Sequence, residues 1–207
     1  MTSIRYLALG DSYTIGELVS PKDRWSIKLE KLLKDEGIQS NVTIIARTGW
    51  TVKELWDGIQ ANPPDGTYDM VSLLIGVNDQ YRGYPVDGYQ EDFRFMLGKA
   101  IECAGGAAEQ VVVLSIPDWG VTPYAKDMGS RPEQVAREID TFNAVNLKEV
   151  ESAGAHYIDI TPISRSAAGD PSLIAGDGLH PSGKMYAMWA EKALPVALEI
   201  LLVGQGE

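Results

Sequence analysis

Residues 5–13 read RYLALGDSY, and this stretch decides the fold. A short apolar run ends at Gly10 and is followed at once by an acid, Asp11, and a hydroxyl, Ser12. An apolar run of this length that ends in glycine is typical of a buried strand. Ligands of open α/β sheets bind beyond the carboxyl ends of the strands, so Ser12 is predicted to lie where a nucleophile is useful. A serine hydroxyl alone is a weak nucleophile, so this hypothesis requires a base and oxyanion donors elsewhere in the chain.

The composition is that of an acidic globular protein. The 207 residues suit one domain, residues 1–207, and 18 basic against 29 acidic residues give a net charge of −11. Nucleic-acid backbones are bound by basic patches, so this charge argues against a nucleic-acid partner. No apolar run in the sequence is long enough to span a membrane. Met1 leads into the first strand without a leader pattern, so we expect a cytoplasmic protein, with a mature secreted form left open.

Cysteine and histidine usage does not point to a metal. Cys103 is the single cysteine, so no internal disulfide is expected, and its amphipathic surroundings favour a buried structural thiol. No cluster of cysteines and histidines has the spacing of a metal site. His156 falls at the start of a predicted strand without a paired acid, and we interpret it as structural.

Strand-like and helix-like stretches alternate after Ser12. A second helix opens at Thr51, which forms a capping-box pattern with Glu54, and Ser20 is expected to cap the first helix. The segments 80–88 and 117–131 are expected to be loops. Alternating strands and helices predict a parallel sheet covered by helices on both faces. The remaining helices are expected at about residues 21–36, 89–101, 132–153 and 182–202, and the remaining strands at about 42–46, 68–75, 110–116 and 155–160.

The predicted strand ends deliver the groups needed for acyl transfer from an ester. Ser12 would attack the carbonyl, and His180 would accept its proton and return it to the leaving alcohol. Asp177 precedes His180 by three residues and would hold the imidazole tautomer, because Gly178 permits a tight turn. The oxyanion would be met by the backbone N–H groups of Ser12 and Gly49 and by the Asn78 amide. Gly49 suits this role because it has no side chain to block the approach.

These residues resemble the blocks of the SGNH hydrolases, also called GDSL-type esterases and lipases. Residues 10–12 (GDS) resemble the first block, although Tyr13 stands where the family motif has leucine, and Gly49 resembles the glycine of the second block, although Arg47 and Thr48 precede it. Residues 76–79 (GVND) and 177–181 (DGLHP) match the third and last blocks closely. The resemblance implies a three-layer α/β/α sandwich of the flavodoxin-like type, with a five-stranded parallel sheet and no cofactor.

Residues that follow the strand ends are candidates for the substrate pocket. Aromatic side chains there would grip an acyl or sugar group, and an arginine would meet an anionic substrate group. Packing residues and a solvated loop charge are the alternatives, and both stay open. The candidates are Trp50, Tyr81, Arg82 and Trp119, together with Asp11.

The leading hypothesis is a serine esterase that hydrolyses a small ester through an acyl-enzyme intermediate. The substrate would be an acetylated carbohydrate, a short-chain acyl ester or a lysophospholipid. An acyl-thioesterase or an acyltransferase would use the same site. A flavodoxin-like module that binds a nucleotide or flavin is a different class, and Asp11 argues against it because an acid stands where a phosphate would lie. A catalytically inactive binding domain is a third class, which the intact Ser12, Asp177 and His180 disfavour.

Overall fold

The sheet is built around the first strand of the chain. The computed structural model describes residues 3–203. Strand β1 (Ile4–Gly10) pairs in parallel with β2 (Ser40–Ala46) on one side and with β3 (Met70–Leu74) on the other. The sheet continues through β4 (Val111–Leu114) and β5 (His156–Ile158), which gives the order β2-β1-β3-β4-β5 with every pair parallel. This is the flavodoxin-like order, and the predicted five-stranded parallel sheet is confirmed.

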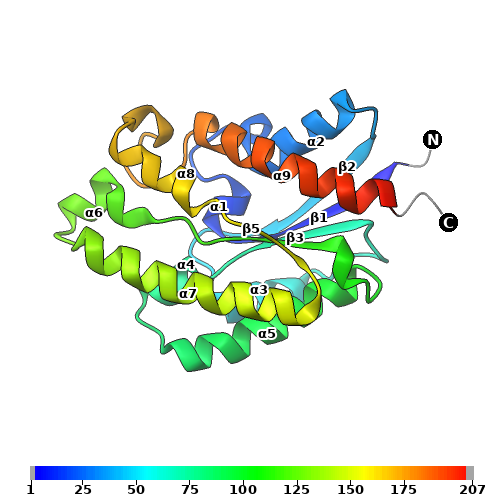
Figure 1. The fold of residues 1–207 in the computed structure, drawn as a ribbon, viewed down its shortest axis with the longest axis horizontal. Helices are drawn as coiled ribbons and strands as arrows, with labels where there is room; N and C mark the ends of the chain where they lie inside the picture. The colour runs from blue at the N-terminus through cyan, green and yellow to red at the C-terminus, as the bar shows by residue number, and fades with distance from the viewer. Residues whose placement is uncertain (1–2, 204–207) are drawn as a thin grey trace.

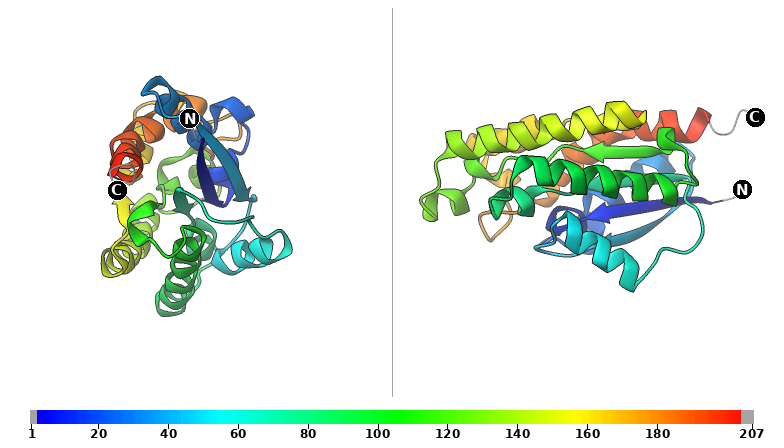
Figure 2. Two further views of the ribbon diagram at one scale, coloured as in Figure 1. Left: turned by 90° about the vertical axis from the view of Figure 1, so that its right-hand side faces the viewer. Right: turned by 90° about the horizontal axis from the view of Figure 1, so that it is seen from below.

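Helices cover both faces of the sheet, as the alternating pattern predicts. Figure 1 shows α2 (Trp25–Asp35) and α9 (Gly183–Val203) on one side of the strands. The long helices α3 (Val52–Ala61), α5 (Val86–Cys103) and α7 (Pro132–Ala153) lie on the other side, and the views in Figure 2 agree. The three layers are therefore an α/β/α sandwich.

Short helices occupy the segments that follow the strands, where the sequence suggested irregular loops. Residues 80–88 and 117–131 are predicted to be loops, but the end of α4 and the first turn of α5 lie in the former and α6 lies in the latter. Thr122 caps α6 through a bond from the Ala125 N–H, and Pro123 takes its first position. The α-helices of this set are α1 (Ser12–Ile15), α4 (Val77–Tyr81), α6 (Pro123–Asp127) and α8 (Thr161–Arg165). The 3₁₀ turns are η1 (Pro21–Asp23), η2 (Ala108–Gln110), η3 (Trp119–Val121), η4 (Ser166–Ala168) and η5 (Pro171–Leu173).

Two local predictions need correction and one is confirmed. Ser20 does not cap α2, because its hydroxyl donates to the Asp23 carboxylate at 2.6 Å and α2 begins only after the 3₁₀ turn. Cys103 is half-buried at the last residue of α5 rather than fully buried. The capping box of Thr51 with Glu54 is present in both directions at the start of α3.

Pairing around Gly10 sets the level at which three segments leave the sheet. Gly10 lies opposite Ala46 of β2 and Leu74 of β3. A side chain could not replace its hydrogen, because a Cβ at this position would lie 2.5 Å from the Leu74 carbonyl oxygen and 2.3 Å from the Thr14 hydroxyl. The segments that follow β1, β2 and β3 therefore start from one edge of the sheet. Ser12, Gly49 and Asn78 lie two to four residues beyond the last residues of these strands.

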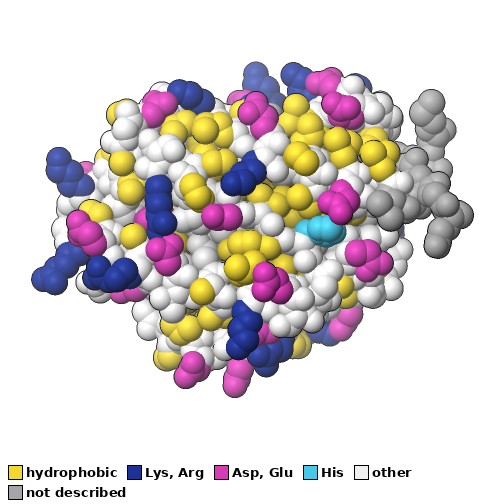
Figure 3. Space-filling model, viewed as in Figure 1, with side chains coloured by type: hydrophobic (Ala, Val, Ile, Leu, Met, Phe, Trp, Pro, Cys, Tyr) yellow, Lys and Arg dark blue, Asp and Glu magenta, His cyan; other side chains and the backbone are white. Residues whose placement is uncertain are grey.

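The length of the described helices and the charge of the surface are two further features of residues 3–203. None of the helices in residues 3–203 is long and apolar enough to span a membrane. On the face shown in Figure 3, basic and acidic side chains are interspersed with apolar ones.

The packing of α2 against α9 predicts a difference between two neighbouring leucines. Leu33 is fully buried, whereas Leu32 is only partly buried. Removing a buried leucine side chain leaves a cavity, so Leu33→Ala is expected to lower the free energy of unfolding by about 2–5 kcal/mol, with a smaller loss for Leu32→Ala. Urea denaturation of the two variants measures the difference, and equal losses would contradict this assignment of the buried face.

Candidate active site

Ser12 is fixed at the junction between the central strand and the first helix. It is the first residue of α1, directly beyond β1, and only 5% of its surface is exposed. Asp11 takes the N-cap position, and its side chain accepts a hydrogen bond from the Tyr13 N–H at 3.0 Å. The predicted nucleophile therefore has a rigid backbone and a hydroxyl that reaches a cavity at the sheet edge.

Asp177 and His180 form a local pair in the loop before α9. The Asp177 carboxylate lies 2.5 Å from His180 Nδ1, and its other oxygen accepts from the N–H groups of Leu179 and His180 at 3.0 Å each. Gly178 has a φ of 73°, which permits the tight turn predicted from the sequence. Burial raises the pKa of Asp177, but the imidazole and the two N–H groups outweigh it and hold the pKa below its usual value. The ionised carboxylate keeps the proton on Nδ1 and leaves Nε2 as an acceptor.

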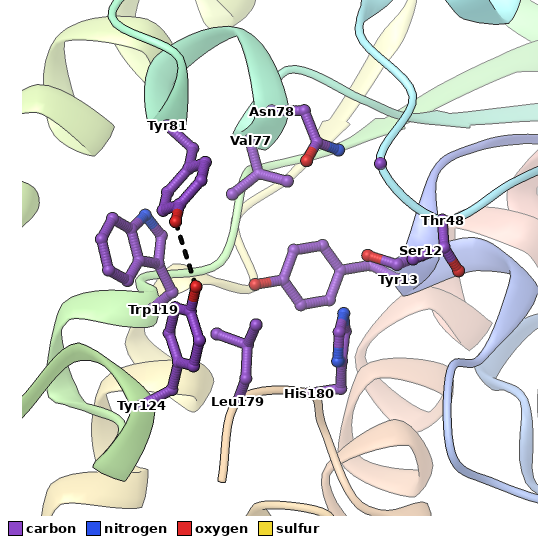
Figure 4. Close-up of a pocket in the computed structure, with 11 residues that line it drawn as sticks. Ser12, Tyr13, Thr48, Val77, Asn78, Tyr81, Trp119, Tyr124, Leu179 and His180 are labelled. Carbon is purple, nitrogen blue, oxygen red and sulfur yellow. Dashed lines mark hydrogen bonds between the residues drawn. The ribbon is translucent and has the colours of Figure 1, made fainter. Parts of the chain in front are cut away.

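The structure brings His180 to the same end of the cavity as Ser12, although the two are far apart in sequence. Both side chains line the cavity, and Figure 4 shows them at the end away from Tyr81 and Trp119. Within residues 3–203 no hydrogen bond joins the two side chains. Such a bond often tightens only when substrate is present. The arrangement supplies a nucleophile, a base and an orienting acid in one place.

Ser12 and two neighbouring residues offer three hydrogen-bond donors to the cavity. The backbone N–H groups of Ser12 and Gly49 have no partner among the described residues. The Asn78 amide donates one N–H to the Trp50 carbonyl at 2.9 Å, and an amide has a second N–H to offer. Gly49 adopts a φ of 85°, and a Cβ there would meet nothing within 4 Å. The positive φ favours glycine, and the open space where a Cβ would stand leaves room for the approach that the sequence predicts.

Helix α4 holds the loop that carries Gly49. Besides the Asn78 bond, the Asp79 carboxylate accepts from the Val52 N–H at 3.1 Å, and Arg82 donates to the Gly49 carbonyl at 2.7 Å. Arg82 also pairs with Glu54 at 3.1 Å. The loop after β2 is therefore held by residues of the helix after β3. These bonds set the distance between the Gly49 N–H and the Asn78 amide.

Two buried carboxyl groups lie beneath these donors. Asp11 is fully buried, and its Oδ2 has no partner among the residues that the structure describes. Burial raises the pKa of Asp11 to about 8, opposed by the Tyr13 N–H and reinforced by the charge of Asp79. Burial also raises the pKa of Asp79 to about 7, against the bond from the Val52 N–H. Both acids are structural supports of the site.

The cavity beside Ser12 has a volume of about 160 Å³ and is largely apolar. Of the five candidate pocket residues, Tyr81 and Trp119 line it, with their rings 5.3 Å apart. Asp11, Trp50 and Arg82 do not. Asp11 is buried below the site, and Arg82 is held by Glu54 and Gly49. The Trp50 ring packs over Gly58 in α3, where a Cβ would lie 2.1 Å from it.

Sequence reasoning did not select five further residues of the cavity wall. Tyr124 comes from α6, in the segment expected to be irregular, and its hydroxyl bonds to that of Tyr81 at 3.0 Å (Figure 4). The pattern Thr122-Pro123 was the signal for that short helix. The other four are each next in sequence to a predicted site residue, and this position was the signal that could have identified them. They are Tyr13, Thr48, Val77 and Leu179.

The remaining candidates for chemistry lie outside the cavity. His156 Nε2 lies 3.0 Å from the Glu109 carbonyl oxygen, a structural contact beside the edge strand. No group of three or more His, Cys, Asp or Glu side chains in the described part of the chain is arranged to hold a metal ion.

Fold and site together define an ester hydrolase with a serine, a histidine and an aspartate at the carboxyl edge of a flavodoxin-like sheet. The comparison with protein families gives the particular assignment. The model of the GDSL-like Lipase/Acylhydrolase family matches residues 8–188, so the chain belongs to this family. The resemblance found in the sequence blocks is confirmed, and the protein is a carboxylic ester hydrolase rather than a nucleotide-binding module.

Solved structures share the fold across nearly the whole chain. The structure of TesA is 21% identical and covers 95% of this chain and 99% of its own, with a TM-score of 0.75. Axe2, an acetylxylan esterase from Geobacillus stearothermophilus, is 19% identical, with 94% of each chain covered and a TM-score of 0.72. The psychrotrophic esterase EstA from Pseudoalteromonas sp. is 19% identical, covering 97% of this chain and all of its own (100%), with a TM-score of 0.70. A search of curated proteins finds no match.

The buried Asp11 carboxyl predicts a pH-dependent stability. An aspartate in the unfolded chain titrates near pH ~4, whereas the folded pKa of Asp11 is about 8. Between these pH values only the folded protein holds this proton, so the free energy of unfolding falls as the pH rises. Asp11→Asn removes this dependence, so the stability of the variant relative to wild type is expected to increase from pH 5 to pH 9.

Urea denaturation at several pH values tests this expectation. Asp57→Asn, at an exposed position of α3, is the matched control. A stability difference between Asp11→Asn and wild type that is constant with pH would show that the Asp11 carboxyl is already ionised.

Proposed function

We propose that this protein hydrolyses esters of short acyl groups through an acyl-enzyme intermediate on Ser12. The observation that carries the proposal is the largely apolar cavity of about 160 Å³, open on one side, that adjoins Ser12, His180 and the free N–H groups. Cavities of ~150 Å³ hold a molecule the size of benzene. A short-chain acyl ester or an acetylated alcohol fits this volume, whereas the long chain of a lysophospholipid exceeds it.

The proposed mechanism follows from the hydrogen bonds at the site. His180 accepts the Ser12 proton at Nε2 because Asp177 holds its Nδ1, and the Ser12 oxygen attacks the ester carbonyl. The developing oxyanion is met by the Ser12 and Gly49 N–H groups and by the second N–H of Asn78. His180 then returns the proton to the leaving alcohol. Water attacks the acyl-enzyme by the same route, and the acid is released.

The position of the base assigns the two halves of the substrate. The leaving oxygen must lie against His180, which protonates it. Tyr81, Trp119 and Tyr124 line the opposite end of the cavity in Figure 4. The acyl group is therefore the half that enters the aromatic end, and the alcohol faces the open side.

Loss of the nucleophile tests the reaction itself. Ser12→Ala is expected to lower turnover of 4-nitrophenyl butanoate by about 10⁴-fold or more, because the acyl-enzyme cannot form. Circular dichroism confirms that the variant is folded. Wild-type kcat/KM measured from acetate to dodecanoate esters is expected to fall once the chain outgrows the cavity. An active, folded Ser12→Ala variant would remove Ser12 from the mechanism.

The Asn78 amide tests the oxyanion assignment. If its free N–H meets the oxyanion only in the transition state, Asn78→Ala lowers kcat by about 100-fold or more with little change in KM. Steady-state kinetics on 4-nitrophenyl butanoate separates the two constants. Normal kcat with a raised KM would show instead that Asn78 shapes the pocket.

A further inference from the structure

The residue after the nucleophile places a polar atom inside the apolar cavity. Tyr13 is buried, with 4% of its surface exposed, and its side chain lines the cavity. Figure 4 shows the ring extending from α1 across the cavity, with its hydroxyl directed away from Ser12 toward the side of Trp119 and Leu179. The family's name motif has leucine at this position, a side chain without a hydroxyl.

The ring of Tyr13 is held firmly in place. Its centroid lies 5.7 Å from that of His180 and 6.1 Å from that of Trp189 in α9. Tyr186 packs on the other side of Trp189 at 5.1 Å, so the three rings form one aromatic cluster. The Tyr13 hydroxyl therefore keeps one position relative to Ser12.

This hydroxyl makes no hydrogen bond to another residue within 3–203, and it faces the cavity. A ligand oxygen that enters the cavity can therefore accept a hydrogen bond from it. Burial, reinforced by the charges of Asp11, Asp118 and Asp177, raises the pKa of Tyr13 well above its usual value. The phenol therefore remains protonated and offers a donor.

We propose that the Tyr13 hydroxyl donates a hydrogen bond to an oxygen atom within the acyl chain of the substrate. The preferred substrates are then esters of short acyl groups that carry an ether, keto or hydroxyl oxygen, and simple hydrocarbon acyl groups leave the donor unpaired. This inference rests on the proposed function, because it takes the acyl group to occupy the aromatic end of the cavity.

Isosteric esters test the preference without changing the size of the acyl group. The substrates are 4-nitrophenyl pentanoate and its two analogues in which oxygen replaces the third or fourth chain atom, the ethoxyacetate and the 3-methoxypropanoate. Each kcat/KM is divided by the hydroxide-catalysed rate constant of the same ester to remove intrinsic reactivity. Wild type is expected to prefer one oxygen-bearing analogue over pentanoate by about tenfold, the scale of one added hydrogen bond.

Two tyrosine variants assign the effect to the hydroxyl. Tyr13→Phe keeps the ring. We expect it to bring the ratio of the corrected kcat/KM values, oxygen-bearing ester over pentanoate, close to one. Tyr186→Phe is the matched control, because it removes a buried hydroxyl from the same aromatic cluster, and Tyr186 does not line the cavity. It is expected to keep the wild-type preference. If Tyr13→Phe does not fold, Tyr13→Leu, which restores the family's residue, takes its place.

Three outcomes would overturn the proposal. The first is a wild-type enzyme that does not prefer either oxygen-bearing ester over pentanoate. The second is a Tyr13→Phe variant that keeps the wild-type preference, and the third is a Tyr186→Phe variant that loses this preference as fully as Tyr13→Phe does. Failure of the proposed function looks different: none of the three esters would be hydrolysed, or hydrolysis would persist in Ser12→Ala.

Discussion

Parallel pairing of β1 with both of its neighbours is the constraint on which the site depends. Gly10 lies opposite Ala46 and Leu74, and the close approach of the Leu74 carbonyl leaves no room for a side chain. The three strands therefore end at one level. Ser12, Gly49 and Asn78 follow those ends, so their N–H groups converge at the point where the strand order reverses, which is the ligand-binding position of open α/β sheets.

Several polar residues of the sequence blocks serve the loops rather than the substrate. Asn78 and Asp79 on α4 and Arg82 at its C-cap bind the segment that carries Gly49. Asp11 caps α1 from a fully buried position. Burial raises the pKa of both Asp11 and Asp79, because it disfavours their charged forms.

The cavity translates this frame into selectivity. Its wall combines residues from the segments after β1, β2, β3 and β4 and from the loop before α9. The bonded pair Tyr81 and Tyr124 lies at the aromatic end, and Trp119 donates from its Nε1 to Gln80. In the proposed function, the size of the acyl group and the polarity that it presents to Tyr13 are the properties that this wall discriminates.

The sequence alone predicted a parallel sheet covered by helices and, with the family resemblance, its five strands, because short apolar strands and glycine turns are local signals. It also selected Ser12, Gly49, Asn78, Asp177 and His180, whereas the order of the strands came from the tertiary structure. The sequence did not determine which neighbours of those residues face the cavity. Trp50 and Tyr81 both follow strand ends, yet Trp50 packs over Gly58 while Tyr81 lines the cavity. The direction of a loop side chain depends on contacts from distant elements, such as the α4 bonds that hold the Gly49 loop. Only tertiary packing decides those contacts, because burial in the folded chain selects among rotamers that the local sequence leaves equally accessible.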